Sequence, residues 1–314
     1  GKSPGMRGDG ALYPSAQGVT FVVLDLGGLT VEWLGVERVH FDAGAMFGPV
    51  PRLLWEGKYP VRRDNLSPFL ATPLLIRTGG KNIIVDTGLG NRLTPKQVRN
   101  FVVEYEETVP RALERKGLSG SDIDAVILTH LDWDHAAGIV ERTGEEDREL
   151  GEERLRYPNA VHVVNEAEWH DAHHPNMRSA NTYWQQNWAL LEAEGNVRLV
   201  RGSEEVAPGV SVHHTGGHTR GHMVVALRGT KRTAYHLADL LPTHAHLNPL
   251  WVTAYDNFPL DTVEQKAKWL ERAKDERAWL LFYHDAVYAG VRLDVEGGIA
   301  QVIARPASPS RQGL

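Results

Sequence analysis

The ten residues THLDWDHAAG, 129 to 138, constrain this chain more than any other stretch. They place His130, Asp132, Asp134 and His135 within six positions. The apolar run AVIL directly before them predicts a buried strand, and HAAGIVE predicts the start of a helix. Imidazoles and carboxylates concentrated at a strand end are typical of a metal site, because the strand fixes the direction of the ligands.

Four other predicted strands also lead to a histidine or an aspartate. They end at or near Asp86 (IIVD), His218 (VSVHHTGG), Asp239 (AYHLAD) and His284 (LLFYHD). A lone histidine is more often an ordinary surface or core residue. Five strand ends that supply ligands in one chain instead predict a shared site, with loops that bend around the ions.

The remaining patterns place these strand ends in one domain. Residues 1–17 and 303–314 are rich in Gly, Ser and Pro and are predicted to be tails, leaving 18–302 as a single domain. Strand and helix patterns occur in both halves, which predicts an α/β fold with sheets inside and helices outside. A helical insertion is predicted near 165–195.

Local signals fix some of the elements. Gly79-Gly80 between LLIR and NIIVD predicts a hairpin. Thr94-Pro95 predicts the start of a helical segment that reaches about Gly117 and breaks at Pro110. Asp261 is predicted to cap a helix over 262–274.

Charge and composition exclude several classes of protein. A net charge of −6 argues against nucleic acid as a partner, because phosphate binding requires a basic face. The absence of cysteine excludes disulfides and thiolate ligands and suits a cytoplasmic protein. No apolar run approaches the ~18–20 residues of a membrane helix. We therefore expect a cytoplasmic protein with a small-molecule substrate and no nucleic-acid or membrane partner.

The order of motifs VDTG, HxxxDH, GHTxGH, AD and HD resembles the metallo-β-lactamase superfamily, over about residues 18–300. The pattern is most similar to N-acyl-homoserine-lactone lactonases and methyl-parathion-hydrolase-like members. NEAEWHDAHHPNMR resembles the helical insertion of the lactonases, and DAGAMFGPVP with LLWEGKYP resembles their pocket loops. The resemblance implies an αββα sandwich of two mixed β-sheets flanked by helices, and a homodimer.

The resemblance also implies a site for two divalent metal ions. His130 and His218 would hold the first ion, and Asp132 stands where the usual HxHxDH pattern has a second histidine. Asp239 would bridge the two ions. Asp134, His135 and His284 would hold the second ion. Asp86 would orient the ligands, and His222 would support the loop of the third motif. Asp239, Asp134 and Asp132 are the catalytic candidates.

Asp132 leaves three interpretations open. As a ligand, it would supply a hard oxygen donor and favour iron or manganese, or a mixed pair, over two zinc ions. If its side chain is too short to reach, the protein would use one ion. If the site has degenerated, the protein would only bind a small ligand.

Aromatic and histidine side chains near the motifs predict a fairly apolar pocket. The candidates are Phe47, Trp55, Trp133, Trp169, Tyr183, His244, His246 and Trp251. The resulting hypothesis is a hydrolase that uses a metal-bridged hydroxide on a small ester-like substrate, with a lactone first and an organophosphate or activated aryl ether next. Two alternatives remain: a di-iron oxidoreductase related to the flavodiiron proteins, whose pattern HxExDH also carries a carboxylate at this place, and a non-catalytic small-ligand binder.

Overall fold

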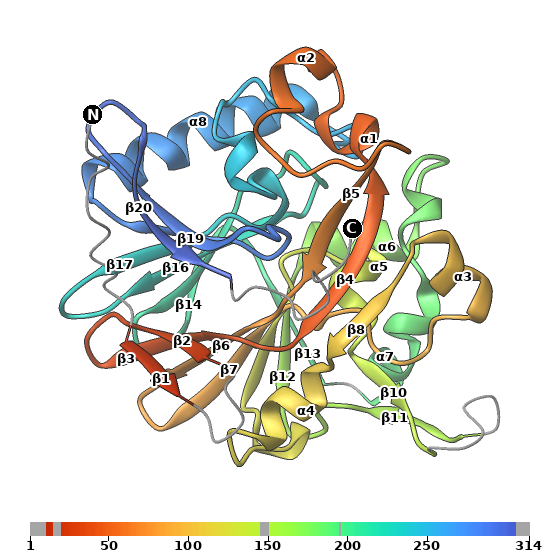
Figure 1. The fold of residues 1–314 in the computed structure, drawn as a ribbon. Helices are drawn as coiled ribbons and strands as arrows, with labels where there is room; N and C mark the ends of the chain where they lie inside the picture. Colours follow the sequence, from red (N-terminus) through yellow and green to blue (C-terminus); the bar gives the residue numbers. More distant parts are fainter. Residues whose placement is uncertain (1–10, 15–19, 145–150, 195, 306–314) are drawn as a thin grey trace.

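The structure is a computed structural model that describes residues 11–14, 20–144, 151–194 and 196–305. Over these residues two large sheets stack face to face, and helices lie on their outer sides (Figure 1). This arrangement confirms the αββα sandwich predicted from the sequence.

The first sheet has eight described strands and is mixed. In spatial order they are β1 (Ala11–Pro14), β2 (Thr20–Asp25), β3 (Leu29–Trp33), β6 (Leu74–Thr78), β7 (Lys81–Val85), β9 (Ala125–Ile127), β12 (Val161–Asn165) and β13 (Val197–Val200). Pairs from β1 to β7 are antiparallel, whereas β7, β9, β12 and β13 run parallel. The parallel strands β7 and β9 therefore end at the same edge of the sheet.

The second sheet has seven described strands. In spatial order they are β14 (Ser203–Ala207), β15 (Val210–His214), β16 (Met223–Arg228), β17 (Thr233–His236), β18 (Trp279–Leu281), β19 (Tyr288–Leu293) and β20 (Ile299–Ala304). Only β17 and β18 pair in parallel, so these two strands also end side by side.

Smaller elements complete the described chain. A three-stranded sheet joins β5 (Leu66–Ala71), β4 (Val36–Asp42) and β8 (Glu104–Glu107), and a hairpin joins β10 (Val140–Arg142) and β11 (Glu153–Leu155). The helices are α1 (Ala43–Phe47), α2 (Arg52–Trp55), α3 (Pro95–Asn100), α4 (Val109–Glu114), α5 (Trp133–Ala136), α6 (Glu166–His173), α7 (Ala189–Glu194) and α8 (Pro259–Asp275). Short 3₁₀ turns are η1 (Gly120–Asp122), η2 (Ser179–Asn181), η3 (Gln185–Asn187), η4 (Ala238–Leu240) and η5 (His244–His246).

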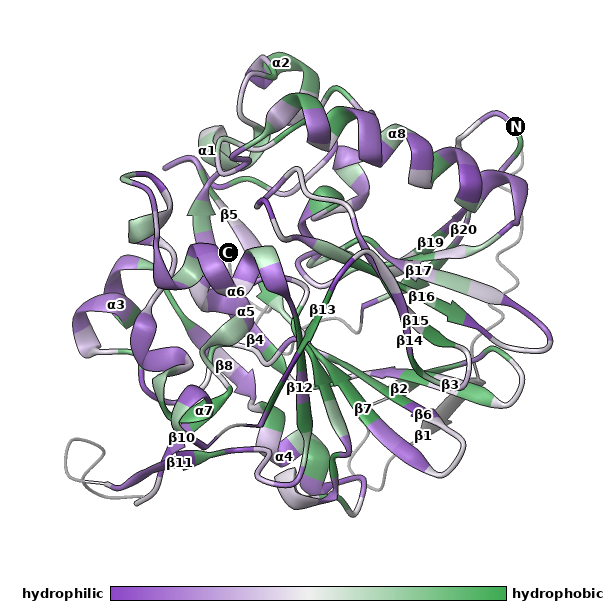
Figure 2. Ribbon diagram, turned by 180° about the vertical axis from the view of Figure 1, so that it is seen from behind, coloured by the Kyte–Doolittle hydropathy of each residue, from purple (hydrophilic) through white to green (hydrophobic). Residues whose placement is uncertain are grey.

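Apolar side chains form three layers around the sheets. One cluster fills the space between them, with Val31, Ile83 and Ile127 from the first sheet and Val225 and Leu281 from the second. A second cluster joins the outer face of the first sheet to α4, and a third joins the second sheet to α8. Strands such as β7, β12 and β16 are correspondingly hydrophobic, whereas α8 alternates between polar and apolar residues (Figure 2).

Several local predictions can be compared with these elements. The hairpin at Gly79-Gly80 is confirmed, because β6 and β7 pair across it. The segment predicted as one helix with a break at Pro110 instead contains α3, β8 and α4, since Val102 takes a positive φ of 46° and ends the helical run. The helix predicted over 262–274 lies within α8, but α8 begins at Pro259, so Asp261 lies in its first turn and does not cap it as predicted.

The predicted tails and insertion also contain ordered elements. Residues 11–14 form β1 at the edge of the first sheet, inside the segment predicted as an N-terminal tail. β20 ends within the predicted C-terminal tail, at Ala304, and residues 306–314 lie outside the described chain. The insertion near 165–195 holds α6, η2, η3 and α7.

Candidate metal centre

The predicted ligands from both sheets meet where the strands end. β7 and β9 lead to Asp86 and His130, while β15, β17 and β18 lead to His218, Asp239 and His284. Two of these ends are sharply turned: Asp86 has φ 57°, and Ala238, just before Asp239, has φ 45°. Non-glycine residues in this left-handed region are strained, and such strain is concentrated at functional sites.

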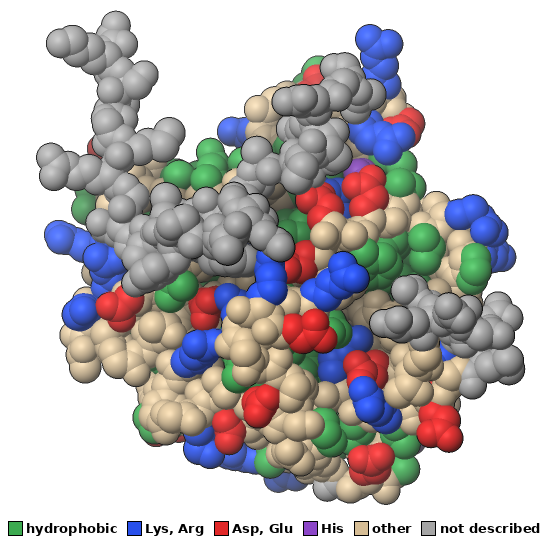
Figure 3. Space-filling view, turned by 60° about the horizontal axis from the view of Figure 1, so that its bottom comes forward, with side chains coloured by type: hydrophobic (Ala, Val, Ile, Leu, Met, Phe, Trp, Pro, Cys, Tyr) green, Lys and Arg blue, Asp and Glu red, His purple; other side chains and the backbone are tan. Residues whose placement is uncertain are grey.

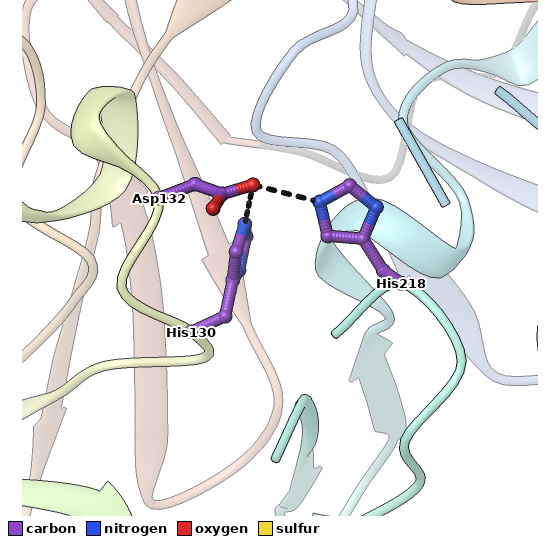
Figure 4. Close-up of side chains that lie close together, drawn as sticks. All are labelled: His130, Asp132 and His218. Carbon is purple, nitrogen blue, oxygen red and sulfur yellow. Dashed lines mark hydrogen bonds and ion pairs between the residues drawn. The ribbon is translucent and has the colours of Figure 1, made fainter. Parts of the chain in front are cut away.

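One group of potential ligands is formed by His130, Asp132 and His218 (Figure 4). The Asp132 carboxylate points between the two imidazoles, with its Oδ2 3.2 Å from His218 Nε2 and 3.7 Å from His130 Nε2. Asp239 Oδ2 closes the group, 3.5 Å from His218 Nε2 and 3.9 Å from His130 Nε2. Asp132 is therefore long enough to reach the place that an ion held by the two histidines would occupy.

A second group is formed by Asp134, His135 and His284, again with Asp239. The other carboxylate oxygen of Asp239, Oδ1, lies 3.2 Å from the Nε2 atoms of both His135 and His284. Asp134 Oδ2 lies 3.6 Å from His284 Nε2. Asp239 thus presents one oxygen to each group, which is the geometry required of a bridging ligand.

These distances fit metal coordination. Ligand atoms ~2.1 Å from a tetrahedral ion are roughly 3.4 Å from one another, close to the separations in both groups. His130 Nε2 and Asp132 Oδ1 are buried and have no hydrogen-bond partner among the described residues, which is costly without a bound cation. Histidine nitrogens and carboxylate oxygens are suitable donors for zinc, iron or manganese.

Hydrogen bonds orient each imidazole from its far side. Asp86 Oδ2 is 2.8 Å from His135 Nδ1, and Asp86 also accepts hydrogen bonds from the Thr129 backbone and hydroxyl. The Thr129 hydroxyl in turn lies 3.0 Å from His130 Nδ1. Asp86 therefore supports ligands of both groups, since such contacts fix the ring that presents Nε2 to a metal.

The remaining two imidazoles have different partners. His218 Nδ1 lies 3.0 Å from Asp256 Oδ1, and His284 Nδ1 lies 2.7 Å from the Leu70 carbonyl oxygen. Tyr283 donates a hydrogen bond to the Asp134 carbonyl oxygen at 2.7 Å. Asp256 was not found by sequence analysis, because it lies in a loop with no strand or motif to mark it.

Charges within the site move the pKa values of its histidines in opposite directions. Burial, and next the nearby His135, lower the pKa of His130 well below its usual range, so this ring is neutral and able to bind a metal. Burial opposes protonation of His135 and His218, but neighbouring carboxylates outweigh it and raise both pKa values. Without ions, protons on these two rings would therefore balance part of the carboxylate charge.

Four of the predicted pocket residues belong to one aromatic cluster. Phe47, Trp55 and Trp133 are buried in it, and Trp251 packs against it. Trp133 lies between Asp132 and Asp134 in the chain and stacks on Trp184, with ring centroids 4.9 Å apart. Tyr283, beside His284, belongs to the same cluster, which therefore adjoins the metal ligands.

The other predicted pocket and supporting residues lie elsewhere or are already hydrogen-bonded. Trp169 and Tyr183 pack in the apolar cluster on the outer face of the first sheet. Both ring nitrogens of His246 are engaged, by Thr243 and by the Met46 carbonyl oxygen. His244 is held by the buried carboxylate of Asp285, 2.6 Å from its Nδ1. His222 is buried with its ring 5.4 Å from that of His130.

Tyr255 is a further aromatic residue near the ligands that sequence analysis did not single out. It is 41% exposed and packs against Phe41, with ring centroids 6.4 Å apart. Partial burial and the negative charges of Asp134 and Asp42 raise the pKa of its hydroxyl. Its phenol is therefore protonated at neutral pH and able to donate a hydrogen bond.

Comparison with known proteins agrees with this geometry. A structure described as a probable metal-dependent hydrolase from Staphylococcus aureus is 36% identical, with a TM-score of 0.84 over 91% of this chain and 100% of that one. Residues 67–142 match the family model of the metallo-beta-lactamase superfamily. The chain belongs to the metallo-β-lactamase superfamily. This membership confirms the resemblance inferred from the order of the motifs.

Other relatives are less similar or share only the fold, and some of them are lactonases. A probable metallo-hydrolase of Mycobacterium tuberculosis is 31% identical over 185 residues, which cover 53% of this chain and 55% of the relative. The chain thus spans about half the length of the curated relatives it matches. A dizinc quorum-quenching lactonase in complex with its product has the same fold, with a TM-score of 0.70 over 92% of this chain and 97% of that one at 20% identity.

The surface and helices give two further findings. On the face shown in Figure 3, acidic and basic side chains are interspersed and form no single-sign field. Among the described helices, none is both long enough and apolar enough to cross a lipid bilayer.

Proposed function

We propose that this protein is a metal-dependent hydrolase that acts on a small, fairly apolar ester-like substrate, with a lactone as the first choice. The observation that carries the proposal is the pair of ligand groups joined by the two oxygens of Asp239. Two divalent ions bound there would supply Lewis-acid activation of water and of the attacked carbonyl. The superfamily membership and the lactonases among its relatives support the reaction class.

The charge of the ligand set favours a neutral substrate. Three carboxylates, Asp132, Asp134 and Asp239, would offset three of the four positive charges of two divalent ions. A histidine in place of Asp132 would leave one more positive charge. The protein therefore has less electrostatic attraction for an anionic substrate, and an ester or lactone that becomes negative only during the reaction suits it better.

The protein's own side chains would position this substrate. Phe41, Trp184 and Trp251, the partly exposed aromatic residues that pack against the buried Phe47 and Trp133, would provide apolar surface for an acyl or alkyl group and limit the access of water. The phenol of Tyr255, close enough to Asp134 for that charge to raise its pKa, would donate a hydrogen bond to a polar atom of the substrate. Asp239, which faces both ion positions, would assist protonation of the leaving group.

The oxygen donor of Asp132 bears on the identity of the ions. A carboxylate in place of an imidazole makes the first position harder in the chemical sense, and we propose iron or manganese there, or a mixed pair with zinc. The proposed cofactors are therefore two divalent ions that need not be the same element.

Metal analysis and turnover test this function together. Protein purified without added metal is expected to hold about two equivalents of metal and to open lactones faster than it hydrolyses phosphotriesters or aryl ethers, until a chelator removes the ions. Asp239→Asn should lose metal and turnover, while Asp275→Asn, an exposed aspartate on α8, should keep both. A native protein without metal and without turnover would refute the proposal. Iron with reductant-dependent oxygen consumption would favour the di-iron oxidoreductase instead.

A further inference from the structure

Glu168 is a buried carboxylate that lies beside the first group of ligands and is not one of them. Its side chain is fully buried in α6. Asn165 caps this helix, and Glu168 is the third helical residue after the cap. A glutamate at that position commonly bonds back to the cap residue. Glu168 instead turns away from its own helix and toward the metal centre.

Three hydrogen bonds hold the Glu168 carboxylate. Its Oε1 accepts from the Leu131 backbone at 2.9 Å and from the Tyr183 hydroxyl at 2.9 Å. Its Oε2 accepts from the Thr219 hydroxyl at 2.6 Å. A buried carboxylate with three donors is well satisfied. Glutamine would keep one acceptor oxygen but turn an amide nitrogen toward a donor, so at least one of the donors would lose its acceptor.

Two of these donors are adjacent to ligands of one ion position. Leu131 lies between His130 and Asp132 in the chain, and Thr219 directly follows His218. One carboxylate thus connects the loop after β9 to the loop after β15, which come from different sheets. The corresponding neighbours of the second position, around His135 and His284, have no hydrogen bond to Glu168 among the described contacts.

The close packing of α6 shows that this contact is tightly built. A side chain at Gly221, two residues after Thr219, would place its Cβ 2.1 Å from the Glu168 backbone nitrogen. Only glycine allows this approach. The carboxylates of Glu168 and Asp132 also repel one another, so a cation at the first position would relieve the repulsion.

From these contacts we infer that Glu168 is a positioning residue for the first ion: it fixes the two loops that carry His130, Asp132 and His218, and the affinity of that position depends on it. This inference rests on the metal centre of the proposed function. It assigns the helical insertion a role in the binding of one ion rather than in general stability.

Zinc titration against a chromogenic chelator tests the inference on the full chain. Wild type should bind two ions with separable affinities. Glu168→Gln, which has the same shape without the charge, should bind the first-position ion 10- to 100-fold more weakly, the usual loss for a partner behind a ligand, and retain the second ion. The matched control is Glu166→Gln on the same helix, a partly exposed residue paired with Arg201; this variant should bind both ions as wild type does.

A double variant identifies the position that is affected. If Glu168 acts through the first position, Glu168→Gln should add little to the loss already caused by Asp132→Ala. Thermal unfolding of the metal-free proteins separates positioning from stability, because a merely structural role would lower the unfolding temperature and leave the metal affinity of the folded protein unchanged.

Thr219→Val provides a milder test if Glu168→Gln does not fold, because it removes one donor and keeps the charge. Thr219→Val should weaken the binding of the first ion by a smaller factor than Glu168→Gln does. Wild-type affinity for both ions in Glu168→Gln and Thr219→Val would overturn the inference but leave the proposed function intact. A wild-type protein that binds no ion would overturn both.

Discussion

The two proposed ion positions share Asp239 but differ in how their other proposed ligands are held. In the second position, His135 is oriented by the fully buried carboxylate of Asp86, and the backbone of Asp134 accepts a hydrogen bond from Tyr283. In the first position, the Asp132 side chain remains 13% exposed and caps no backbone group of α5. Within the described chain, its carboxylate Oδ2 lies 3.2 Å from His218 Nε2 and 3.7 Å from His130 Nε2, both of them proposed ligands.

This difference indicates where the site tolerates variation. A ligand that is itself held by the protein keeps its direction when the metal leaves, whereas Asp132 depends on the loop around Leu131 and therefore on Glu168. We expect the first position to exchange its ion more readily than the second. It is also the position where the chain departs from the HxHxDH pattern.

Removal of one imidazole from each position should have the largest effect. His284→Ala should lose the second ion and reduce turnover by well over 100-fold, because even partners behind a ligand contribute 10- to 100-fold. His218→Ala should empty the first position, keep the second ion and retain a measurable residual rate. Metal content and lactone turnover of both variants measure these effects. Loss of both ions in His218→Ala with retention of one in His284→Ala would show that the first position, not the second, holds its ion more firmly.

Variants of the two supporting carboxylates should distinguish the positions more finely. Asp256 contacts only His218 among the ligands, so Asp256→Asn should weaken the first ion by about 10- to 100-fold and leave the second unchanged. Asp86 contacts His135 directly and reaches His130 through Thr129, so Asp86→Asn should weaken both. Chelator titration with zinc measures both affinities. Weaker binding of the second ion in Asp256→Asn would contradict the assignment of Asp256 to the first position.

The sequence was most informative where chemistry demands particular atoms. The structure gathers all seven side chains proposed as ligands, His130, Asp132, Asp134, His135, His218, Asp239 and His284. Their signal was strong because five strand ends supply histidine or aspartate in one chain, whereas any one of them alone would indicate little. Even so, the motif alone could not show that Asp132 reaches between His130 and His218, since this depends on the separation of two loops from different sheets.

Residues that act through others left no such signal. Asp256 lies 38 positions from His218 in sequence, and nothing local relates the two. Glu168 follows Asn165 as a capping glutamate would, so its reach to another loop could not be read from the helix pattern. Trp169 and Trp133 were alike in sequence, but the fold turns only Trp133 toward the aromatic cluster beside the ligands. Which face a side chain occupies is decided by tertiary packing.

Asp132→His should change the first position from a carboxylate to the usual imidazole. The fold should be retained, because Asp132 makes no capping bond to α5, and the ratio of zinc to manganese affinity at the first position should rise about tenfold, the scale of one supporting contact. Competition between the two metals, measured by elemental analysis, checks this ratio. Unchanged metal content and an unchanged rate would show that Asp132 is not a ligand.

The smallest effect on the ions is expected from Glu37, which supports the turn after Asp86. Its buried carboxylate accepts hydrogen bonds from the Leu89 and Val109 backbones, and burial raises its pKa to about 7. Glu37→Gln keeps an acceptor and no titrating group, so both ion affinities should remain within about threefold, below the loss typical of a direct supporting partner.

The same variant should alter the pH dependence of folding. A pKa raised from 4.5 to about 7 in the folded protein favours the protonated form, so the associated stability is complete below pH ~4.5 and is lost as pH rises to about 7. This pKa shift corresponds to about 3 kcal/mol in the free energy of unfolding. Burial also raises the pKa of Glu168 to about 7, so this group changes the stability of the metal-free protein with pH in the same direction. Denaturant unfolding of metal-free Glu37→Gln should therefore lose less stability between pH 5 and 8 than wild type, whereas the exposed Glu114→Gln should follow wild type. An unchanged pH profile would show that Glu37 titrates normally and that the turn behind the second position carries no buried proton.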